Sequence, residues 1–530
     1  MRALETVAAC VLLLQATAVC KYLEVVQIED KNYWYELGKS RLQNQLKKTM
    51  NFNRAKNAIF FVGDGMGLTT VTASRIYKGQ LNGETGEENY HAFDLFPDIG
   101  LVKTYNTDKQ VPDSAGTATA MFCGVKTKYY TAGIDSTLPT GECDPELYEA
   151  AKVDSLLKWA QDAGKRTGLV TTTRITHATP SAAYAHIAER NWECDGKIPS
   201  EYQGCMKDIA RQLVEESPGK DINVVFGGGQ KQLGFATGDD DSCERTDGLN
   251  LTEIWENDRK AEGVSHRFVI NRGQMEELST EDKVLGLFGL GHMAYDLERD
   301  TGADGPPSIV NMTVKAIQML QRGENGFMLI VEGGRIDHAH HDNFAKLALS
   351  EAIRFEEAIS AALAMTSRDD TLIVVTADHS HSLTMNGYPN RGNDILGFAH
   401  DEPDKPIYET LTYANGPGYN VHRKNGSIDS DEYLWNDPTL MEDRDETRYM
   451  HFAPIYEETE THGGEDVAVY AIGPQSHLFN GVFEQSYLAH AISCIGKFGP
   501  NPTLCSNAPV SAKSTSILIM AFLYILNRLI

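Results

Sequence analysis

The chain has 530 residues, nine cysteines and a net charge of −26, from 48 basic against 74 acidic side chains. So acidic a surface argues against a nucleic-acid partner. It also repels an anionic substrate at long range, so a site for an anion needs a local concentration of positive charge. Length alone suggests about three domains.

The first 50 residues predict a secretion signal followed by a helical arm. Arg2 precedes the apolar run Val7–Leu14, and Ala16-Thr-Ala18 offers a small-residue cleavage site. Residues 1–20 are therefore interpreted as a signal peptide, and a cut after Ala18 or after Cys20 fits equally well. The segment from Tyr22 to Met50 mixes charged and aromatic residues and is interpreted as the arm.

A buried strand is predicted at Ala58–Val62, and the glycine-rich turn Gly63-Asp64-Gly65-Met66-Gly67 follows it. A dinucleotide fingerprint is an alternative reading of this turn, but its third glycine falls one residue early. Glycines around a strand-end aspartate let the backbone turn tightly, and Asp64 can then bridge two cations.

The segment Val111–Met121 contains a candidate nucleophile, Ser114. Pro112 and Asp113 indicate a turn, and the small residues after Ser114 predict a closely packed helix. Ser114 then lies near a helix N-terminus, which favours an anion. No Gly-x-Ser-x-Gly motif surrounds it, so a metal ion has to replace the histidine base. An ordinary N-cap serine is the alternative.

Further candidates are His177 and Thr179 in Thr176–Pro180, the arginine Arg190, and His462 in Glu460–Gly464. Arginine presents a planar fork that matches phosphate oxygens. Taken alone, each of these segments has an equally good structural interpretation.

The most informative stretch is Val331–Asp342, which holds a glutamate, two aspartates and three histidines directly after an apolar run. Asp337 and His341 are four residues apart and can converge on one ion. The next run, Thr371–Ala377, ends in Asp378-His379. Oxygen and nitrogen donors without cysteine suit catalytic zinc, and strand ends are where open α/β sheets place their sites. A solvated helix face is the alternative for the first pair alone.

Candidate ligands spread from Asp64 to His462 must meet in one pocket, so a single domain over residues 21–506 is predicted. We expect an α/β fold with a large central, mostly parallel β-sheet flanked by helices on both faces. Its predicted buried strands are Ala58–Val62, Thr167–Thr173, Ile222–Phe226, Phe327–Val331 and Leu372–Ala377. Residues 386–461, rich in Gly, Pro, Asn and Asp, predict a small irregular insertion of loops and short strands.

Together these motifs closely resemble the alkaline phosphatase family in its animal, membrane-anchored form, from about Lys21 to Cys505. The resemblance implies three metal sites in one pocket: one zinc ion on Asp337, His341 and His462; a second zinc ion on Asp64, Ser114, Asp378 and His379; and one magnesium ion on Asp64, Thr179 and Glu332. It places His177 beside the magnesium, Arg190 on the phosphoryl oxygens and His338 near the leaving group.

The implied reaction is hydrolysis of phosphate monoesters through a covalent phosphoserine on Ser114. The resemblance also implies a homodimer embraced by the arm, with residues 386–461 as a crown-like insertion. A fourth, calcium site uses a glutamate after Gly-Leu-Phe in mammalian members. Here Gly289 follows Gly286-Leu-Phe288, although Asp304 remains, so that fourth site is not predicted.

By the same resemblance, Cys143–Cys205 and Cys494–Cys505 are disulfides, Cys194 and Cys243 are a candidate third pair, and Cys123 is a buried thiol. Export permits such bridges. Three sequons, at Asn250, Asn311 and Asn425, are compatible with N-glycosylation.

The carboxyl end predicts a glycosylphosphatidylinositol (GPI) anchor signal. The apolar run Ile517–Ile530 is shorter than the roughly 20 residues that span a bilayer. It follows a polar spacer, Pro509–Ser516, and the small residues Ser506-Asn507-Ala508. Ser506 or Asn507 is the expected attachment residue, residues 507–530 the removed propeptide, and the outer face of the plasma membrane the location. A tail-anchored helix is the alternative.

Two other functions remain open at this point. A related hydrolase, such as a sulfatase or phosphodiesterase, is the first. Asp113-Ser114-Ala115 lacks the Cys/Ser-x-Pro-x-Arg setting of sulfatases, and diesterases more often use threonine and lack a clamp like Arg190. The second is a surface-binding protein that has lost catalysis, against which stands the presence of every expected zinc ligand.

Overall fold

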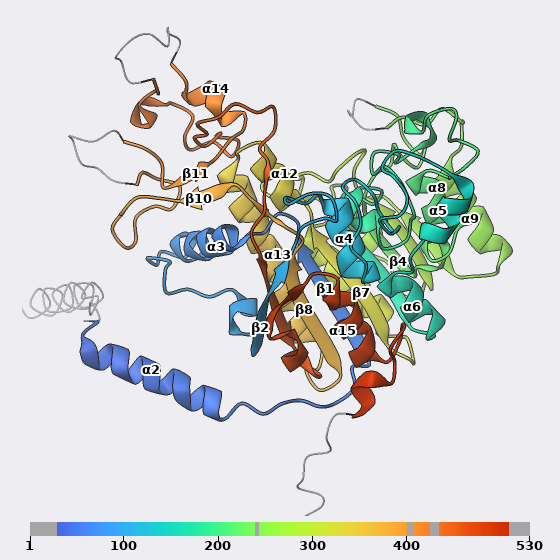
Figure 1. Ribbon diagram of the computed structural model, residues 1–530, viewed down its shortest axis with the longest axis horizontal. Coiled ribbons are helices and arrows are strands. Elements are labelled where there is room, and N and C mark those ends of the chain that lie inside the picture. Colours follow the sequence, from blue (N-terminus) through green and yellow to red (C-terminus); the bar gives the residue numbers. More distant parts are fainter. Residues whose placement is uncertain (1–28, 239–242, 400–406, 425–433, 508–530) are drawn as a thin grey trace, which may run out of the picture. The chain divides into compact units, whose positions relative to one another are not determined.

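The computed structural model describes residues 29–238, 243–399, 407–424 and 434–507 (Figure 1). They form two parts, which are described separately: residues up to Met50, and a compact unit from Asn51 onwards. In the first part, α2 (Lys31–Leu46) begins after Asp30, whose side chain accepts hydrogen bonds from the backbone N–H groups of Asn32 and Tyr33. The predicted signal peptide and anchor propeptide lie outside the described residues, apart from Asn507.

The compact unit is built on a sheet that has ten strands among the described residues. These are β1 (Asn57–Gly63), β2 (Asp98–Lys103), β3 (Arg166–Arg174), β4 (Val224–Gly228), β5 (His266–Val269), β6 (Lys283–Leu287), β7 (Phe327–Gly333), β8 (Thr371–Ala377), β13 (Val467–Ile472) and β14 (Gly481–Glu484). Their order is β14-β2-β13-β8-β1-β7-β3-β4-β6-β5. Only β13 is antiparallel to its neighbours among these strands, so the predicted mostly parallel α/β sheet is confirmed.

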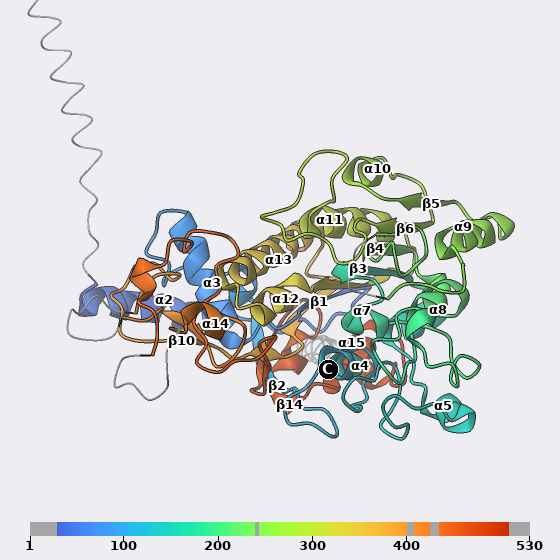
Figure 2. The same cartoon turned by 90° about the horizontal axis from the view of Figure 1, so that it is seen from above.

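The helices of this unit cover both faces of the sheet. They are α3 (Leu68–Leu81), α4 (Ser114–Cys123), α5 (Pro145–Ala151), α6 (Leu156–Asp162), α7 (Ala178–Ser181), α8 (Ile209–Glu215), α9 (Leu251–Ala261), α10 (Arg272–Glu276), α11 (Ile309–Leu320), α12 (Arg335–His341), α13 (Ala345–Met365), α14 (Gly418–His422) and α15 (Tyr487–Gly496). Short 3-10 helices are η1 (Ala92–Leu95), η2 (Asp195–Lys197), η3 (Gly219–Asp221), η4 (Pro438–Leu440), η5 (Ser476–Phe479) and η6 (Leu504–Asn507). Figure 2 shows α11 and α13 on one side of the sheet and α4 and α15 on the other.

Alternation along β1 explains why both faces of the sheet are covered. Successive strand side chains point to opposite faces, and both Phe60 and Phe61 are fully buried. Phe60 packs edge-to-face on Phe122 of α4, and Phe61 packs in the same way on Phe355 of α13. A strand that is apolar at every position therefore needs a helix on each side.

The predicted insertion, residues 386–461, contains more order than loops alone. Leu411–Tyr413 (β11) pairs antiparallel with β10 (Leu383–Met385), and α14 and η4 follow (Figure 1, orange). Ile395, Leu411 and Tyr413 are buried in a small core that also includes Ile76 of α3 and Leu349 of α13. This packing attaches the insertion to one side of the main unit.

Three disulfides join Cys143–Cys205, Cys194–Cys243 and Cys494–Cys505, and Cys123 is a free, buried thiol. Of the sequon residues, Asn250 caps α9 and Asn311 takes part in the capping box of α11, both half-buried. Asn425 lies outside the described residues. Within the described part of the chain, no helix combines the length and apolarity needed to cross a membrane.

Candidate active site

Three parallel strands bring most of the predicted ligands to one edge of the sheet. β1 lies between β7 and β8, and the three end in register. Asp64 and Asp378 directly follow β1 and β8, and the Gly65 N–H donates to Asp378 Oδ1 at 3.0 Å. Glu332 lies near the end of β7, and α12, which follows, carries Asp337. The carboxyl ends of these strands thus form the floor of the site.

The turn after β1 requires glycine at position 65. Gly65 has a φ of +68°, a left-handed conformation that side chains with a Cβ rarely adopt. A Cβ placed there would lie 2.4 Å from Nε2 of His381. The backbone at position 65 therefore lies so close to His381 that only glycine fits there.

One group of ligand atoms consists of Asp337, His341 and His462. The Nε2 atoms of the two histidines each lie 3.4 Å from an Asp337 carboxylate oxygen, and they lie 3.2 Å from each other. Nδ1 of His341 lies 2.5 Å from the Glu460 carbonyl, and Nδ1 of His462 lies 2.8 Å from the Pro112 carbonyl. Carbonyls only accept, so both protons are on Nδ1 and two lone pairs face each other. A cation between them removes that repulsion, so these residues fit zinc.

His381 belongs to the same group, but neither of its ring nitrogens has a free lone pair for a metal ion. Its Nε2 lies 2.7 Å from Asp337 Oδ1, and its Nδ1 lies 2.5 Å from Glu460 Oε2. Burial lowers the pKa of His381, but Glu460 and Asp337 outweigh it and raise that pKa to about 10. Both ring nitrogens donate to carboxylates, so His381 orients Asp337 instead of offering a lone pair.

A second group joins Ser114 to Asp64, Asp378 and His379. His379 Nε2 lies 3.1 Å from Ser114 Oγ, 3.4 Å from Asp64 Oδ1 and 3.2 Å from Asp378 Oδ2. The His379 ring stacks on His462 with centroids 3.6 Å apart. The two groups are therefore adjacent parts of one pocket.

The carboxylates of this second group are buried close together, and the charge of Arg190 offsets only part of their repulsion. Asp64 is fully buried, and its Oδ2 has no hydrogen-bond partner. Burial, and then the nearby Asp378 and Asp337, raise the pKa of Asp64 well above its usual range. Burial likewise raises the pKa of Asp378. Buried carboxylates this close need a cation or a proton, and the donor set fits zinc.

A third group contains Asp64, His177 and Glu332, with Thr179 beside Glu332. Oγ1 of Thr179, Oε1 of Glu332 and Oδ2 of Asp64 are all buried without a hydrogen-bond partner among the described residues. Burial raises the pKa of Glu332 to about 7, although Thr171 donates a hydrogen bond to it. Buried oxygen atoms with unused lone pairs fit magnesium, which prefers oxygen ligands.

Ser114 is the first residue of α4, and it does not cap that helix. The N-cap is Asp113, whose carboxylate accepts from the N–H groups of Ala115 at 3.1 Å and Gly116 at 3.3 Å. The alternative interpretation of Ser114 as an N-cap serine is therefore wrong. Its hydroxyl is free to face His379 and Asp64, at the positive end of a buried helix.

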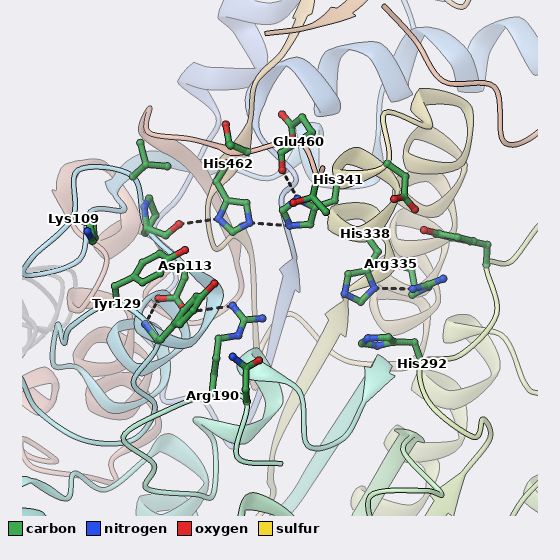
Figure 3. A pocket seen from close by; sticks show the side chains of 18 of the residues that line it. Lys109, Asp113, Tyr129, Arg190, His292, Arg335, His338, His341, Glu460 and His462 are labelled. Atoms are coloured by element: carbon green, nitrogen blue, oxygen red, sulfur yellow. Dashed lines mark hydrogen bonds and ion pairs between the residues drawn. The ribbon is translucent and has the colours of Figure 1, made fainter. Parts of the chain in front are cut away.

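Arg190 reaches the pocket from the loop after α7. One amino group donates to Asp113 Oδ2 at 3.3 Å, and the other lies 3.1 Å from Nε2 of His177. With His338, His341 and His462, Arg190 lines a cavity of about 850 Å³ (Figure 3). The guanidinium is held in place and faces the space where an anion would sit.

Several residues of the site have no signal of their own in the sequence. Glu460 and Asp113 act through a ligand or the arginine, and such pairings depend on distances that only the fold supplies. His381 could have been suspected, because it follows His379 at the two-residue spacing that returns a strand to the same face. His292, which also lines the cavity, lies in a segment without a metal-ligand pattern. Arg335 lies within the ligand-rich stretch Val331–Asp342, but an arginine cannot bind a metal ion and so drew no attention there.

Comparison with known proteins gives a consistent result. The sequence profile of the family described as alkaline phosphatase matches residues 55–498. The chain is 46% identical to Alkaline phosphatase 4 of Drosophila melanogaster, over 89% of this chain and 82% of that protein. It is 44% identical to the tissue-nonspecific isozyme of alkaline phosphatase from Gallus gallus, covering 94% and 95%. It is 40% identical to the membrane-bound alkaline phosphatase of Bombyx mori, covering 88% and 85%.

Solved structures show the same fold at lower identity. The alkaline phosphatase of Thermus thermophilus superposes with a TM-score of 0.58 at 22% identity, covering 85% of this chain and 93% of that one. A mutant of the alkaline phosphatase from the Antarctic bacterium TAB5, described with Mg bound, gives a TM-score of 0.56 at 23% identity, covering 84% and 99%.

Proposed function

We propose a mechanism for this chain, which belongs to the alkaline phosphatase family and hydrolyses phosphate monoesters. In it, Ser114 is first phosphorylated by the substrate, and water then removes the phosphoryl group from Ser114. The observation that carries the proposal is the position of the Ser114 hydroxyl. It is buried, is not used as a helix cap, and lies 3.1 Å from His379 Nε2 inside a group of buried carboxylates.

The residues that would hold the metal ions are those whose donor atoms already converge. Asp337, His341 and His462 suit one zinc ion; Asp64, Asp378, His379 and Ser114 suit a second; Asp64, Thr179 and Glu332 suit magnesium. When bound, these ions supply the positive charge that lowers the pKa of a hydroxyl and stabilises the entering and leaving oxygens. His177 then lies beside the magnesium.

The side chains of the chain perform the remaining tasks. Ser114 Oγ loses its proton and attacks phosphorus, and the ester oxygen leaves on the opposite side. Arg190 neutralises the phosphoryl oxygens and holds them in line with Ser114. Water then attacks the phosphoserine and releases inorganic phosphate and free Ser114. His338, on the same helix as Asp337 and His341, lies on the side of the departing alcohol.

The chain is further proposed to work as a homodimer on the outer cell surface, held by a GPI anchor. Three disulfides fit export, and the Bombyx mori relative is described as membrane-bound. Exposed Trp34, Leu42 and Leu46 on α2 offer apolar surface to a partner subunit. Release of activity from intact cells by a phosphatidylinositol-specific phospholipase tests the anchor, and sedimentation tests the dimer.

The covalent step separates this function from the alternatives. A diesterase would hydrolyse bis(p-nitrophenyl) phosphate faster than p-nitrophenyl phosphate, and a protein that has lost catalysis would hydrolyse neither. We expect the monoester to react faster, and replacement of Ser114 by alanine to abolish its steady-state turnover. Wild-type turnover by that variant would disprove the covalent mechanism.

A further inference from the structure

Three histidine rings lie close together next to Arg190, the arginine proposed to bind phosphate. None of the three belongs to a proposed set of metal ligands. The ring centroids of His177 and His292 are 5.0 Å apart, those of His177 and His338 are 5.2 Å apart, and those of His292 and His338 are 4.2 Å apart. One nitrogen from each ring lies within 4.8 Å of the others. Such a cluster is open to two interpretations, as a further cation site or as a set of donors for an anion.

Arginine contacts decide between them. Arg190 lies 3.1 Å from Nε2 of His177. Arg335 Nη1 lies 2.8 Å from Nδ1 of His338. Arg174 contacts both nitrogens of His292, through its side chain at 2.5 Å and its backbone N–H at 3.2 Å. Arginine can only donate and a neutral imidazole has a single lone pair, so each ring accepts at one nitrogen and that lone pair is not free for a metal ion.

The proton positions that follow favour an anion. An imidazole that accepts at one nitrogen carries its proton on the other. His338 accepts at Nδ1, so its Nε2 is an N–H donor, and the residue lines the same cavity as Arg190, next to Arg335 and His292 (Figure 3). Of the three rings, His338 therefore presents an N–H group, backed by the guanidinium of Arg335, to the cavity that also holds Arg190.

Arg335 differs from the other two arginines of this cluster because its charge is only partly compensated. It acts against the burial that raises the pKa values of Asp342 and Glu351, without forming an ion pair with either. Arg174 is paired with Glu193, and Arg190 with Asp113. Among the described residues no carboxylate lies within ion-pair distance of Arg335, and its buried Nε has no acceptor. The guanidinium stacks on Tyr295, 3.9 Å from the ring centroid. A cation held flat by an aromatic ring, with donors to spare, is a preorganised oxyanion contact.

We propose that Arg335 and the Nε2–H of His338 form a second oxyanion subsite, which binds an anionic group on the leaving group of the substrate. The preferred substrates are then phosphate monoesters whose leaving alcohol carries a carboxylate, and diphosphates, whose leaving group is itself a phosphate. The inference rests on the proposed function, because it needs the phosphoryl group at Arg190. His177 touches Arg190 and packs against His338, which touches Arg335, so the two subsites are contiguous.

The test compares kcat/KM for phenyl phosphate, para-carboxyphenyl phosphate and inorganic diphosphate in the wild type and in Arg335→Gln. For each substrate, kcat/KM of the variant is divided by kcat/KM of the wild type, so differences in leaving-group reactivity between the substrates cancel. We expect Arg335→Gln to lower kcat/KM by about 10- to 100-fold for at least one of the two anionic substrates. The phenyl phosphate value should fall by less than about threefold, because that leaving group makes no charged contact with Arg335.

The pattern of losses also identifies the group. Loss for diphosphate alone assigns the subsite to a terminal phosphate, and loss for the carboxyphenyl ester alone assigns it to a carboxylate. An equal loss for all three substrates, or no loss for either anionic one, overturns the proposal. The matched control is Arg448→Gln, because Arg448 also lines the cavity but is 60% exposed and is paired with Glu298 at 2.7 Å. It should leave the ratios within about twofold of wild type.

Two further measurements keep the outcome decisive. Wild-type turnover of phenyl phosphate is measured first, and its absence would refute the proposed function itself, together with the subsite. If Arg335→Gln does not fold, inhibition of the wild type replaces it. Phosphonoacetate should then inhibit at least about tenfold more tightly than methylphosphonate, as expected for one extra charge-assisted contact. Equal or weaker inhibition contradicts the subsite.

Discussion

His381 and Asp337 are joined by a hydrogen bond of 2.7 Å from Nε2 of the histidine to Oδ1 of the carboxylate. The other ring nitrogen of His381 is held by Glu460. This chain of contacts fixes the direction of the Asp337 carboxylate while its second oxygen stays on the side of His341. An outer layer of this kind sets the affinity of a metal site without supplying a ligand.

Replacing His381 by asparagine should therefore weaken zinc binding while the three proposed ligands remain. Loss of an orienting partner lowers metal affinity by about 10- to 100-fold. The measurement is residual activity and bound zinc across a series of zinc buffers. His266→Asn, on β5 at the end of the strand order and away from the central strands of the site, is the control and should match wild type. An unchanged zinc affinity in His381→Asn would show that Asp337 needs no such support.

Arg190→Gln should weaken the binding of inorganic phosphate as a competitive inhibitor. The variant keeps hydrogen-bond donors but loses the charge and the planar fork, which predicts a Ki higher by about 10- to 100-fold. Arg211→Gln removes an arginine that pairs with Glu215 on α8 and should leave the Ki unchanged. A Ki within twofold of wild type in Arg190→Gln would place the phosphate elsewhere.

Glu332→Gln should remove the response to magnesium and leave zinc content intact. Glu332 Oε1 is a buried acceptor without a partner, and an amide of the same shape supplies too little negative charge for magnesium. Activity is titrated with magnesium after chelation and reloading with zinc. Glu351→Gln is the matched control, because burial also raises the pKa of Glu351 to about 7. Loss of zinc from Glu332→Gln would contradict the separate magnesium site.

Gly65→Ala tests the close approach of the backbone to the site. The control is Gly263→Ala, because Gly263 has nearly the same φ, +69°, with no atom within 4 Å of an added Cβ. Both variants carry the backbone strain, but only Gly65→Ala meets His381. We expect it to lose about 1–3 kcal/mol more free energy of unfolding than the control, measured by denaturant titration. Equal losses would mean that the turn has room.

The sequence predicted the ligand-bearing part of the fold better than the sheet edges. Apolar runs at β1, β7 and β8 are diagnostic because both faces of those strands are buried. The run predicted at Ile222–Phe226 is observed as β4 two residues later. β2, β5 and β14 were not predicted, because their burial is partial. β6 and β13 were not predicted either, although they are largely buried, and the β13 run gives no sign of its antiparallel direction.

The site divides in a similar way. Asp64, Asp378 and His379 directly follow buried strands, so their position could be argued from the sequence. The same holds for Glu332 near the end of β7 and for Asp337 and His341 on the helix that follows it. His462 comes from a separate short strand, β12 (His462–Gly463), paired with β9 (Ser380–His381). Only the family resemblance placed it with Asp337. The family itself is confirmed by the profile match and by relatives that are 40–46% identical over most of the chain.

Ser114 is proposed to carry the phosphoryl group during turnover, and trapping of the phosphoserine decides whether it does. The enzyme is quenched in acid during turnover of p-nitrophenyl phosphate and digested, and the mass of the peptide that contains Ser114 is measured. We expect a peptide heavier by one phosphoryl group, with the modification on Ser114, and no such peptide from Ser114→Ala. An active enzyme whose Ser114 peptide is never phosphorylated, or a label on another residue, would contradict it.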